Sequence, residues 1–440
     1  MSSTSRRSLL RRTCAGTVAL AATLTLGACS SGSDTGAAST GPVEITYWSW
    51  MPGTQETAEA FNKAQSKVHV TYQKSPSSTE ILTQLSNAVK AGNGPDVVNV
   101  EYNALPEVVS QGQLKDLGSA KDTVGLFPQS VRELVILGDK TWAVPFDASP
   151  QELWYRKDLF AQYGVTAPKT WDDFRAAAAK VKQAAPDTRI TTLWTDDPAP
   201  LTGMAWQAGA KWFAVQGQAW KPAVDDAATL KVASYWDDLV KGDLVWTQKA
   251  YSPEWTKGLV DGKTLSYIGG PWSGGGIKTM APDQAGKWGV LPLPTWDGTP
   301  ATGLMGGSVF AVSKDSKDKR KNEAALAFIT FATTTPEGIK ARLGSGKSTA
   351  LPAFTDVRSV AATTFDPAYF GSENPYTVAG NQVDTIRPGW VYGPVQLAVN
   401  AELKNGLAKV ASGGSLTDAV KAAQQKAVAE IKNRGLNLAP

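Results

Sequence analysis

The sequence contains few of the residues that hold metals or act as general bases. Among 440 residues there is one histidine, His69, and there are two cysteines, Cys14 and Cys29. So small a set argues against a zinc site, an iron–sulfur cluster and a Ser-His-Asp triad built in the usual way. His69 alternates with Val68 and Val70, which is typical of a residue on a strand surface. Much familiar enzyme chemistry is therefore argued against, and we predict no metal site and no cofactor.

Long hydrophobic runs are also missing. No stretch of about 18 apolar residues could span a bilayer, and a composition of 42% hydrophobic and 19% charged residues is ordinary for a folded chain. This composition argues against a disordered chain and a polytopic membrane protein. The length exceeds the ~150 to 250 residues that one hydrophobic core usually organises, so we expect at least two lobes.

Net positive charge disappears once the first 28 residues are set aside. That segment holds Arg6, Arg7, Arg11 and Arg12 and no acidic residue, so 40 basic residues remain against 40 acidic ones. Nucleic-acid binding depends on clustered Lys and Arg that release counterions from phosphates. We therefore expect no nucleic-acid partner.

Residues 1–28 have the pattern of a signal peptide. Their basic start is followed by about 14 mostly apolar residues from Ala15, a length too short to span a bilayer. We expect this segment to be removed. The run S-R-R-S-L-L-R, from Ser5 to Arg11, resembles a twin-arginine export signal. Adjacent arginines also occur in ordinary secretory signals, so both export routes remain open.

Cys29 is a candidate lipidation site. The run L-G-A-C, from Leu26 to Cys29, ends the apolar segment and resembles the bacterial lipoprotein box. That resemblance implies that Cys29 is acylated and becomes the first residue; a plain cleavage site beside an incidental cysteine is the alternative. Residues 29–42 have the small, polar composition of a flexible tether. We expect a domain held by lipid at the extracytoplasmic face of the cell membrane, without a disulfide.

The first part of the remaining chain alternates strands and helices. Strands are expected at 43–48, 68–72 and 97–100, with a helix near Thr54 and another after Ser77. The second helix has the strongest pattern, because Ser77 and Glu80 form a capping box before an apolar stripe. Alternation of this kind predicts a parallel sheet with helices on both faces, and ligands bind beyond the carboxyl ends of such strands. The loops after Trp48 and Val100 are therefore candidate walls of a binding crevice.

The rest of the chain is mostly helical. Thr170 and Asp173 form a second capping box, before a helix whose apolar side includes Phe174 and Val181. Further elements are expected as helices at 228–241 and 253–260, a glycine-rich loop at 269–277, a strand at 288–291, a helix within 394–410 and a last helix from Ser415.

One motif suggests nucleotide binding and fails on its context. The run G-S-G-K-S-T, from Gly344 to Thr349, resembles the end of a phosphate-binding P-loop, but Ala341 occupies the position of the first glycine. A P-loop follows a buried strand and begins a helix. This run follows a helical pattern and leads to Pro352, so we do not expect it to bind a nucleotide.

The sequence is rich in tryptophan, with 16 indoles. Most tryptophans are core residues, but a flat indole can also cover the apolar face of a sugar while Asp, Glu and Asn bind its hydroxyls. Candidate oxygen partners are Glu101, Asn103 and Asp147. The tryptophans beside glycine, proline or loop signals are Trp48, Trp50, Trp194, Trp206, Trp272 and Trp390.

Four stretches together resemble the family 1 extracellular solute-binding proteins, which deliver sugars to ABC importers. They are G-P-D-V-V-N-V at 94–100, P-F-D-A-S-P-Q-E-L-W-Y-R-K-D-L-F at 145–160, A-P-K-T-W-D-D-F at 167–174, and the run from G-G-S-V-F-A-V-S to A-L-A-F-I-T-F at 306–331. The second and fourth are the most specific, and the likeness covers essentially the whole chain after Cys29.

The resemblance implies an α/β, two-lobed fold like that of the type II periplasmic binding proteins, each lobe a sheet flanked by helices and joined to the other by a hinge. The N-terminal lobe would comprise residues 43–147 plus 304–350, and the C-terminal lobe 148–303 plus 351–440. The chain would cross between the lobes near residues 147–151, 303–307 and 348–351.

The resemblance also implies a set of ligand-binding residues. They are Trp48, Ser49, Glu101, Asp147, Trp272, Gly306, Gly307 and Trp390. Near Trp390 the turn-rich sequence leaves Arg387 and Tyr392 as alternatives. Trp206 is added from composition, because the central region of the family varies too much to align.

The function implied is that of a substrate-binding lipoprotein of an ABC transporter. A monomer would capture an extracytoplasmic mono- or oligosaccharide by closure of its lobes and deliver it to the transmembrane permease subunits, without enzymatic chemistry. Two alternatives remain. One is a binding protein for a non-sugar solute such as a polyol phosphate or a peptide, and the other is an exported glycoside hydrolase, which needs two carboxylates roughly 5 to 10 Å apart.

Overall fold

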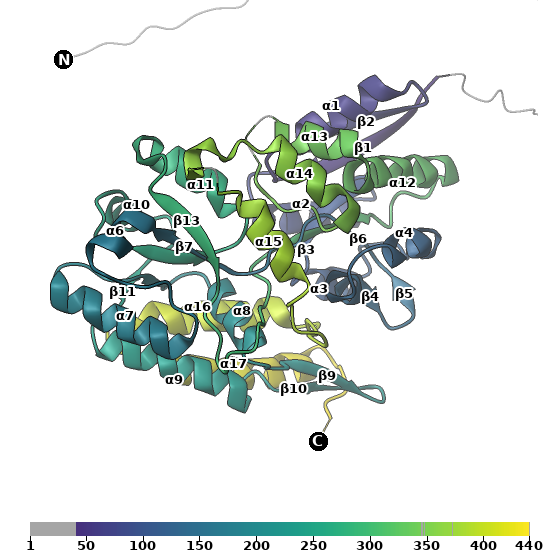
Figure 1. The fold of residues 1–440 in the computed structure, drawn as a ribbon. Coiled ribbons are helices and arrows are strands. Elements are labelled where there is room, and N and C mark those ends of the chain that lie inside the picture. The colour runs from purple at the N-terminus through teal and green to yellow at the C-terminus, as the bar shows by residue number, and fades with distance from the viewer. Residues whose placement is uncertain (1–40, 345, 347, 372, 440) are drawn as a thin grey trace, which may run out of the picture. The chain divides into compact units, whose positions relative to one another are not determined.

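The computed structural model describes residues 41–439 apart from residues 345, 347 and 372 (Figure 1). The predicted signal peptide, the predicted lipid on Cys29 and most of the predicted tether lie outside the described residues. Within the part of the chain that the structure describes, no helix combines the length and the apolar character needed to cross a membrane.

The first lobe is built on a five-stranded sheet in the order β2-β1-β3-β14-β6. Its strands are β1 (Val43–Ser49), β2 (Val68–Lys74), β3 (Val97–Glu101), β6 (Val144–Pro145) and β14 (Ser308–Val312). β1 is parallel to β2 and to β3, as predicted. β14 is antiparallel to both of its neighbours, β3 and β6. The chain passes through the second lobe before it returns to form β14. No crossover helix among the described residues connects β14 to a neighbouring strand, and parallel neighbours need such a connection.

Helices that connect the parallel strands follow the sequence pattern closely. α1 (Thr54–Ala64) buries Ala58 and Phe61, and α2 (Ser78–Lys90) buries an apolar stripe every four residues. The hydroxyl of Ser77 accepts a hydrogen bond from the backbone N–H of Glu80 at 3.1 Å, which satisfies one of the free donors at the start of α2.

Of two later helices, α12 (Lys319–Thr334) packs against β1 of the first sheet, and α13 (Pro336–Gly344) packs against α1 and α12. The ring of Phe328 in α12 lies 5.0 Å from Tyr47 of β1 and 5.4 Å from Phe61 of α1. Phe328 and Tyr47, which are 281 positions apart, therefore share one core. The other helices and strands between β3 and β6 are α3 (Leu105–Ser110), α4 (Lys121–Gly125), α5 (Gln129–Arg132), β4 (Ile136–Leu137) and β5 (Lys140–Thr141).

The second lobe is built on a three-stranded sheet in the order β12-β7-β13. All its pairs are antiparallel, between β7 (Glu152–Arg156), β12 (Ser266–Gly269) and β13 (Trp288–Pro292). A parallel pair joins β8 (Thr192–Trp194) to β11 (Trp246–Gln248), and β9 (Phe213–Gln216) pairs with β10 (Ala219–Pro222). The helices are α6 (Lys157–Gln162), α7 (Trp171–Ala184), α8 (Ala199–Gln207), α9 (Ala227–Lys241), α10 (Pro253–Val260), α11 (Ser273–Met280), α16 (Gln396–Val410) and α17 (Leu416–Asn433).

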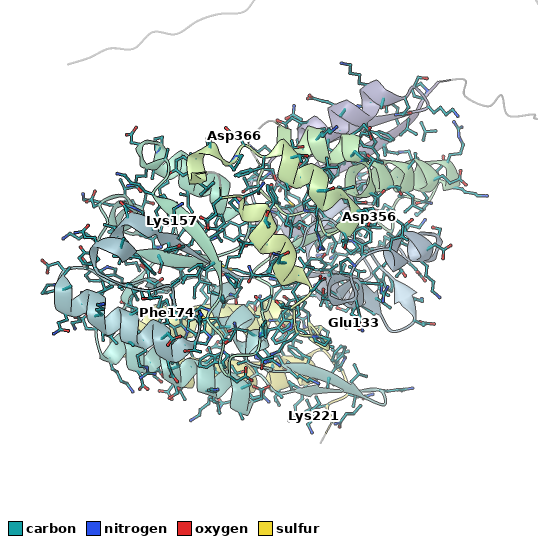
Figure 2. All side chains as sticks on the ribbon, viewed as in Figure 1. Glu133, Lys157, Phe174, Lys221, Asp356 and Asp366 are labelled. Carbon is teal, nitrogen blue, oxygen red and sulfur yellow. The ribbon has the colours of Figure 1, made fainter. Side chains whose placement is uncertain are left out.

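The capping box predicted for α7 is present in both directions, between Thr170 and Asp173. α7 buries Phe174 among the helices of the second lobe, whereas charged side chains such as Glu133 and Lys221 lie at the surface (Figure 2). α17 packs along α16 and α9. Most tryptophans of this lobe are core residues, and those with less than about 2% of the side chain exposed are Trp154, Trp171, Trp206, Trp212, Trp236, Trp255 and Trp288.

Three segments of the chain run side by side between the two sheets. Ala148 donates its N–H to Leu351 O at 3.0 Å, and Met305 donates its N–H to Ser149 O at 2.8 Å. They are the segments in which the chain is expected to cross between the lobes. Of the two helices that follow them, α14 (Arg358–Thr364) packs against α13, and α15 (Pro375–Val383) packs against β13. The exact residues at which the lobes divide stay a prediction.

Candidate functional site

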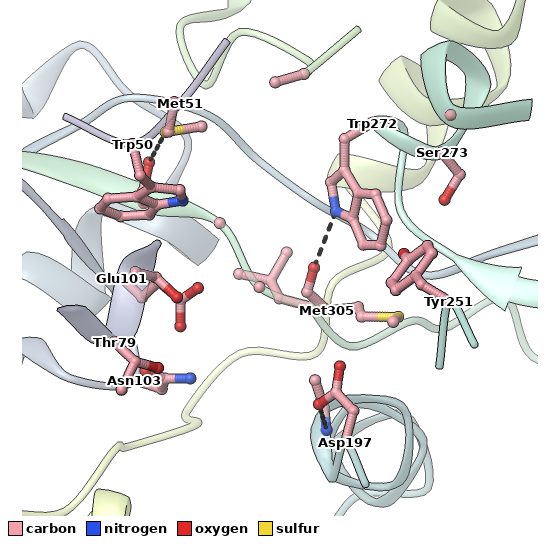
Figure 3. A pocket seen from close by; sticks show the side chains of 18 of the residues that line it. Trp50, Met51, Thr79, Glu101, Asn103, Asp197, Tyr251, Trp272, Ser273 and Met305 are labelled. Atoms are coloured by element: carbon pink, nitrogen blue, oxygen red, sulfur yellow. Dashed lines mark hydrogen bonds between the residues drawn. The ribbon is translucent and has the colours of Figure 1, made fainter. Parts of the chain in front are cut away.

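A cavity of about 1330 Å³ lies between the two lobes (Figure 3). The first lobe contributes Trp50, Met51, Ser78, Thr79, Glu101 and Asn103, and the second contributes Asp196, Asp197, Tyr251, Trp255, Trp272 and Lys404 among others. The crossing segments add Asp147, Met305, Gly306, Gly307, Ser348 and Thr349. The lining thus combines aromatic faces, oxygen acceptors and exposed backbone.

The first-lobe wall forms where parallel strands end. Trp50 follows β1 and Glu101 is the last residue of β3, so both side chains reach the same edge of the sheet. Figure 3 shows the indole of Trp50 above the carboxylate of Glu101 on this wall. Trp50 is half-buried, which leaves part of its ring free for a partner.

Glu101 has an unusual electrostatic setting. Burial in the cavity wall raises the pKa of its carboxyl above the ordinary value, and the negative charge of Asp197 raises it further, while hydrogen bonds with Ser78 and Asn103 lower it. Asp197 and Glu101 point into the cavity from different walls (Figure 3). A ligand hydroxyl that donates to either carboxylate would replace the hydration that the cavity removes.

The second-lobe wall is shaped by two consecutive aspartates before α8. Asp197 Oδ1 accepts the N–H of Ala199 at 2.9 Å, and burial raises the pKa of the Asp197 carboxyl. Asp196 Oδ1 accepts the N–H of Ala250 at 2.8 Å and thereby fixes the loop that carries Tyr251.

Tyr251 is held in a strained conformation. Its backbone φ of 55° lies in the left-handed region, which residues other than glycine rarely adopt. The residue is nevertheless 54% exposed, and its ring packs 5.0 Å from Trp255 and 5.4 Å from Trp194. An exposed aromatic ring on a strained, anchored backbone beside a cavity is typical of a prearranged binding surface.

The chain matches the model of the family "Bacterial extracellular solute-binding protein" over residues 48–339. The chain belongs to this family. A lactose-binding protein of Rhizobium radiobacter is 27% identical over 292 residues, which cover 63% of this chain and 68% of that protein. A maltooligosaccharide ABC transporter solute-binding lipoprotein of Streptococcus pneumoniae is 27% identical over 332 residues, or 70% of each chain. Among solved structures, an ABC transporter-associated binding protein from B. animalis subsp. lactis in complex with beta-1,6-galactobiose is 28% identical, with a TM-score of 0.77 over 91% of this chain and 100% of that one.

The structure of this solute-binding protein brings five of the predicted ligand-binding residues to the cavity: Glu101, Asp147, Trp272, Gly306 and Gly307. Their ligand contacts themselves stay a prediction. Trp272 precedes α11 and is half-buried, and its carbonyl accepts the hydroxyl of Thr349 at 2.9 Å. A Cβ at Gly270 would lie 2.5 Å from the indole nitrogen of Trp272, so this glycine makes room for the ring.

Asp147 lines the cavity and also bonds the crossing segments. Its Oδ1 accepts the N–H of Ser308 at 2.7 Å, and its Oδ2 accepts the hydroxyl of Ser149 at 3.3 Å. Burial raises the pKa of the Asp147 carboxyl, and the fully buried guanidinium of Arg342 opposes that shift. Asp147 therefore ties the crossing segments together and offers the cavity less acceptor capacity than Glu101 does.

Trp48 and Ser49 do not line the cavity, although their neighbour Trp50 does. Both belong to β1, where Trp48 pairs with Gln73 and the carbonyl of Ser49 accepts the N–H of Ser75 at 2.8 Å. Ser49 is fully buried. The strand continues one residue further than the sequence indicated, so the chain leaves the sheet at Trp50.

Trp206 and Trp390 do not reach the cavity either. They are 2% and 3% exposed, and the indole of Trp206 donates to Arg387 O at 2.7 Å. Arg387 in turn donates through Nε to Gln207 O, away from the cavity. Of the alternatives near Trp390, it is Tyr392 that lines the cavity.

Sequence reasoning passed over several lining residues of the second lobe. Tyr251 and Trp255 could have been noticed as aromatics near a turn, but Gln396, Asn400 and Lys404 have the pattern of an ordinary helix. Of the P-loop-like run, Gly344 is the last residue of α13, and Ser348 and Thr349 line the cavity. No group of three potential metal ligands occurs within residues 41–439 as described.

Proposed function

We propose that this solute-binding protein captures a mono- or oligosaccharide between its lobes and delivers it to the membrane subunits of an ABC importer. The observation that carries the proposal is a cavity with aromatic rings on opposite walls and carboxylate oxygens between them. Trp50 stands on the first lobe, and Trp272 and Tyr251 stand on the second (Figure 3). Sugars present apolar C–H faces and hydroxyl rims, which suit such walls.

The polar groups of the lining support a neutral, hydroxyl-rich ligand. Glu101 and Asp197 supply carboxylate oxygens, and the buried Gln396 Oε1 and Trp255 Nε1 have no hydrogen-bond partner among the described residues. Buried polar groups without partners are costly, so a ligand that pairs with them gains affinity. Lobe closure would remove water and strengthen these hydrogen bonds.

The relatives point to the same class of ligand. Their names specify lactose and maltooligosaccharides, and the similar solved structure holds a galactobiose. These relatives differ in their sugars.

The charge of the cavity disfavours an anionic solute such as a polyol phosphate. Among the lining residues that the structure describes, Glu101, Asp147, Asp196 and Asp197 are acidic, whereas Lys404 alone is basic. A phosphate or carboxylate ligand would need more cationic partners than this to offset the loss of its hydration.

A glycoside hydrolase is the competing function that one observation favours. Glu101 and Asp197 both face the cavity, and the pKa of each carboxyl is raised by burial, as for a general acid. We propose binding without chemistry, because the family and its relatives are binding proteins.

The proposed cycle needs movement and an anchor. The two lobes would close about the crossing segments near Asp147 and Gly306 once a sugar has bound, and the permease subunits would recognise the closed monomer. Lipid on Cys29 would keep the protein at the extracytoplasmic face of the membrane, where the permease lies.

A screen of the protein against mono-, di- and trisaccharides tests the proposal. A ligand at 100 times its Kd adds about 2.7 kcal/mol to the free energy of unfolding, which thermal unfolding detects and calorimetry confirms. Intact sugar recovered from the complex is the expected result. Recovery of cleaved product would establish a hydrolase, and stabilisation by a non-sugar solute alone would overturn the sugar assignment.

A further inference from the structure

An ion pair joins the two lobes away from the large cavity. Arg434, which follows α17 of the second lobe, donates through Nη2 to Oε1 of Glu107 in α3 of the first lobe at 3.1 Å. The two residues are 327 positions apart in sequence. Neither lines the cavity between the lobes.

The guanidinium of Arg434 is also held by hydrogen bonds within its own lobe. Its Nε donates to Glu430 Oε1 at 3.1 Å within α17, and its Nη1 donates to Pro394 O at 2.9 Å. Glu107 is held on the other side by Gln111, whose amide donates to the same carboxylate oxygen at 3.3 Å. The side chains of Glu107 and Arg434 are 10% and 28% exposed. This pair is therefore less screened by solvent than an ordinary surface pair.

The surrounding interface between the lobes is not tightly packed. A second cavity, of about 260 Å³, is lined by residues of α2 and α3, including Glu107, by Gln111 and Gln113 after α3, and by Leu397 of α16. Leu82 and Leu397 line both cavities, so the two hollows adjoin. The Glu107–Arg434 pair thus bridges a part of the interface where apolar packing contributes little.

We infer that Glu107 and Arg434 are positioning residues that favour the closed arrangement of the lobes and thereby raise the affinity for the ligand without touching it. The apparent Kd of a ligand that binds the closed form is its intrinsic Kd divided by the closed fraction. A contact between lobes that opening breaks raises that fraction. The affinity readout of this inference rests on the proposed function, whereas the inference about the lobes does not.

A double-mutant cycle measures the effect on affinity. Glu107→Gln and Arg434→Gln are each expected to weaken binding of a sugar found in the screen about two- to fivefold, and the double variant is expected to bind as weakly as either single one. Glu430→Gln is the matched control, because it removes another ion-pair partner of the same guanidinium within one lobe. Additive losses in the double variant, or an equal loss in the control, would show that the pair does not act as a link between lobes.

The dependence of sugar affinity on salt concentration is a second test, because a pair that only stabilises the fold would not change it. At about 1 M ionic strength the Debye length falls to about 3 Å, so the pair is screened. A neutral sugar is then expected to bind more weakly to the wild type than at low salt, while the Glu107→Gln variant shows no such difference. Equal salt dependence in both proteins would overturn the inference.

The lobes can also be followed without any ligand. Cys14 and Cys29 are the protein's two cysteines, so the full chain with both changed to serine carries no other thiol. New cysteines at the exposed positions His69, in the first lobe, and Val215, in the second lobe, then accept spin labels. Glu107→Gln is expected to lengthen or broaden the distance between the labels, and Glu430→Gln to leave it unchanged. An unchanged distance between the labels in Glu107→Gln would contradict the inference even if sugars bind. A changed distance would support it even if no sugar binds.

Discussion

The indole rings of Trp206 and Trp390 stack face to face, with centroids 4.9 Å apart and planes 8° from parallel. Trp212 lies 5.3 Å from Trp390, and Tyr392 meets both stacked rings edge-on. Four aromatic residues from α8, the segment after it and the turn before α16 therefore form one cluster. The faces that could have covered a sugar cover one another.

Trp206→Ala is accordingly expected to act on stability. Loss of a fully buried indole costs about 3 to 5 kcal/mol in the free energy of unfolding, and the carbonyl of Arg387 loses its donor. Urea unfolding of the variant and the wild type measures this difference. Sugar affinity of the folded variant should stay close to that of the wild type; a large loss of affinity with unchanged stability would return Trp206 to the binding site.

Trp272→Ala is expected to act on binding instead. Its half-buried indole lines the cavity, so removal should weaken sugar binding by more than about tenfold with little change in the thermal midpoint. Calorimetry on the variant measures the affinity. Trp246→Ala is the control, because Trp246 is also half-buried but lies outside the cavity lining. Unchanged affinity in Trp272→Ala would remove this residue from the site.

Tyr251 offers a test of stacking against hydrogen bonding. If its ring packs on a sugar, Tyr251→Phe keeps the affinity and Tyr251→Ala lowers it about two- to tenfold. Asp196→Ala should reproduce part of the loss, since it releases the loop from the N–H of Ala250. Comparison of the three Kd values decides the matter, and an effect of Tyr251→Phe as large as that of Tyr251→Ala would identify the hydroxyl as the group that binds.

The raised pKa of the Glu101 carboxyl is expected to make the free energy of unfolding depend on pH. Burial raises the pKa of its carboxyl in the folded protein above the ordinary 4.5, so between these two values the folded chain binds more protons than the unfolded chain. The contribution of this group to stability is fully present below pH about 4.5 and is lost as the pH rises through the folded pKa. Glu101→Gln should flatten the fall in free energy of unfolding over that window.

Denaturant unfolding at a series of pH values measures the effect of Glu101, and the exposed Glu133 supplies a control through Glu133→Gln. Parallel pH curves for the wild type and Glu101→Gln would contradict the assignment. A bound sugar that donates to the carboxylate should lower its pKa, so protons are expected to leave the protein on binding.

The sequence by itself determined the local elements and the family. Caps at Ser77 and Thr170 and the apolar stripe of α2 depend on residues within a few positions of one another, so they appear in the chain as in the structure. The parallel order of β1, β2 and β3 followed from their connecting helices, and it brought Glu101 to the edge where the cavity lies. The four stretches that resemble the family were enough to identify the fold.

The tertiary structure alone decided which residues of one kind lie in the cavity. Trp206 and Trp272 both stand near glycine or loop signals, yet one is stacked in a cluster and the other lines the cavity. Asp147 and Asp197 are both acidic residues near proline, yet the carboxylate of Asp147 accepts a hydrogen bond from the backbone N–H of Ser308, in another crossing segment. These outcomes depend on partners from 161 to 184 positions away, and no local pattern encodes such contacts, because packing is set by the whole fold.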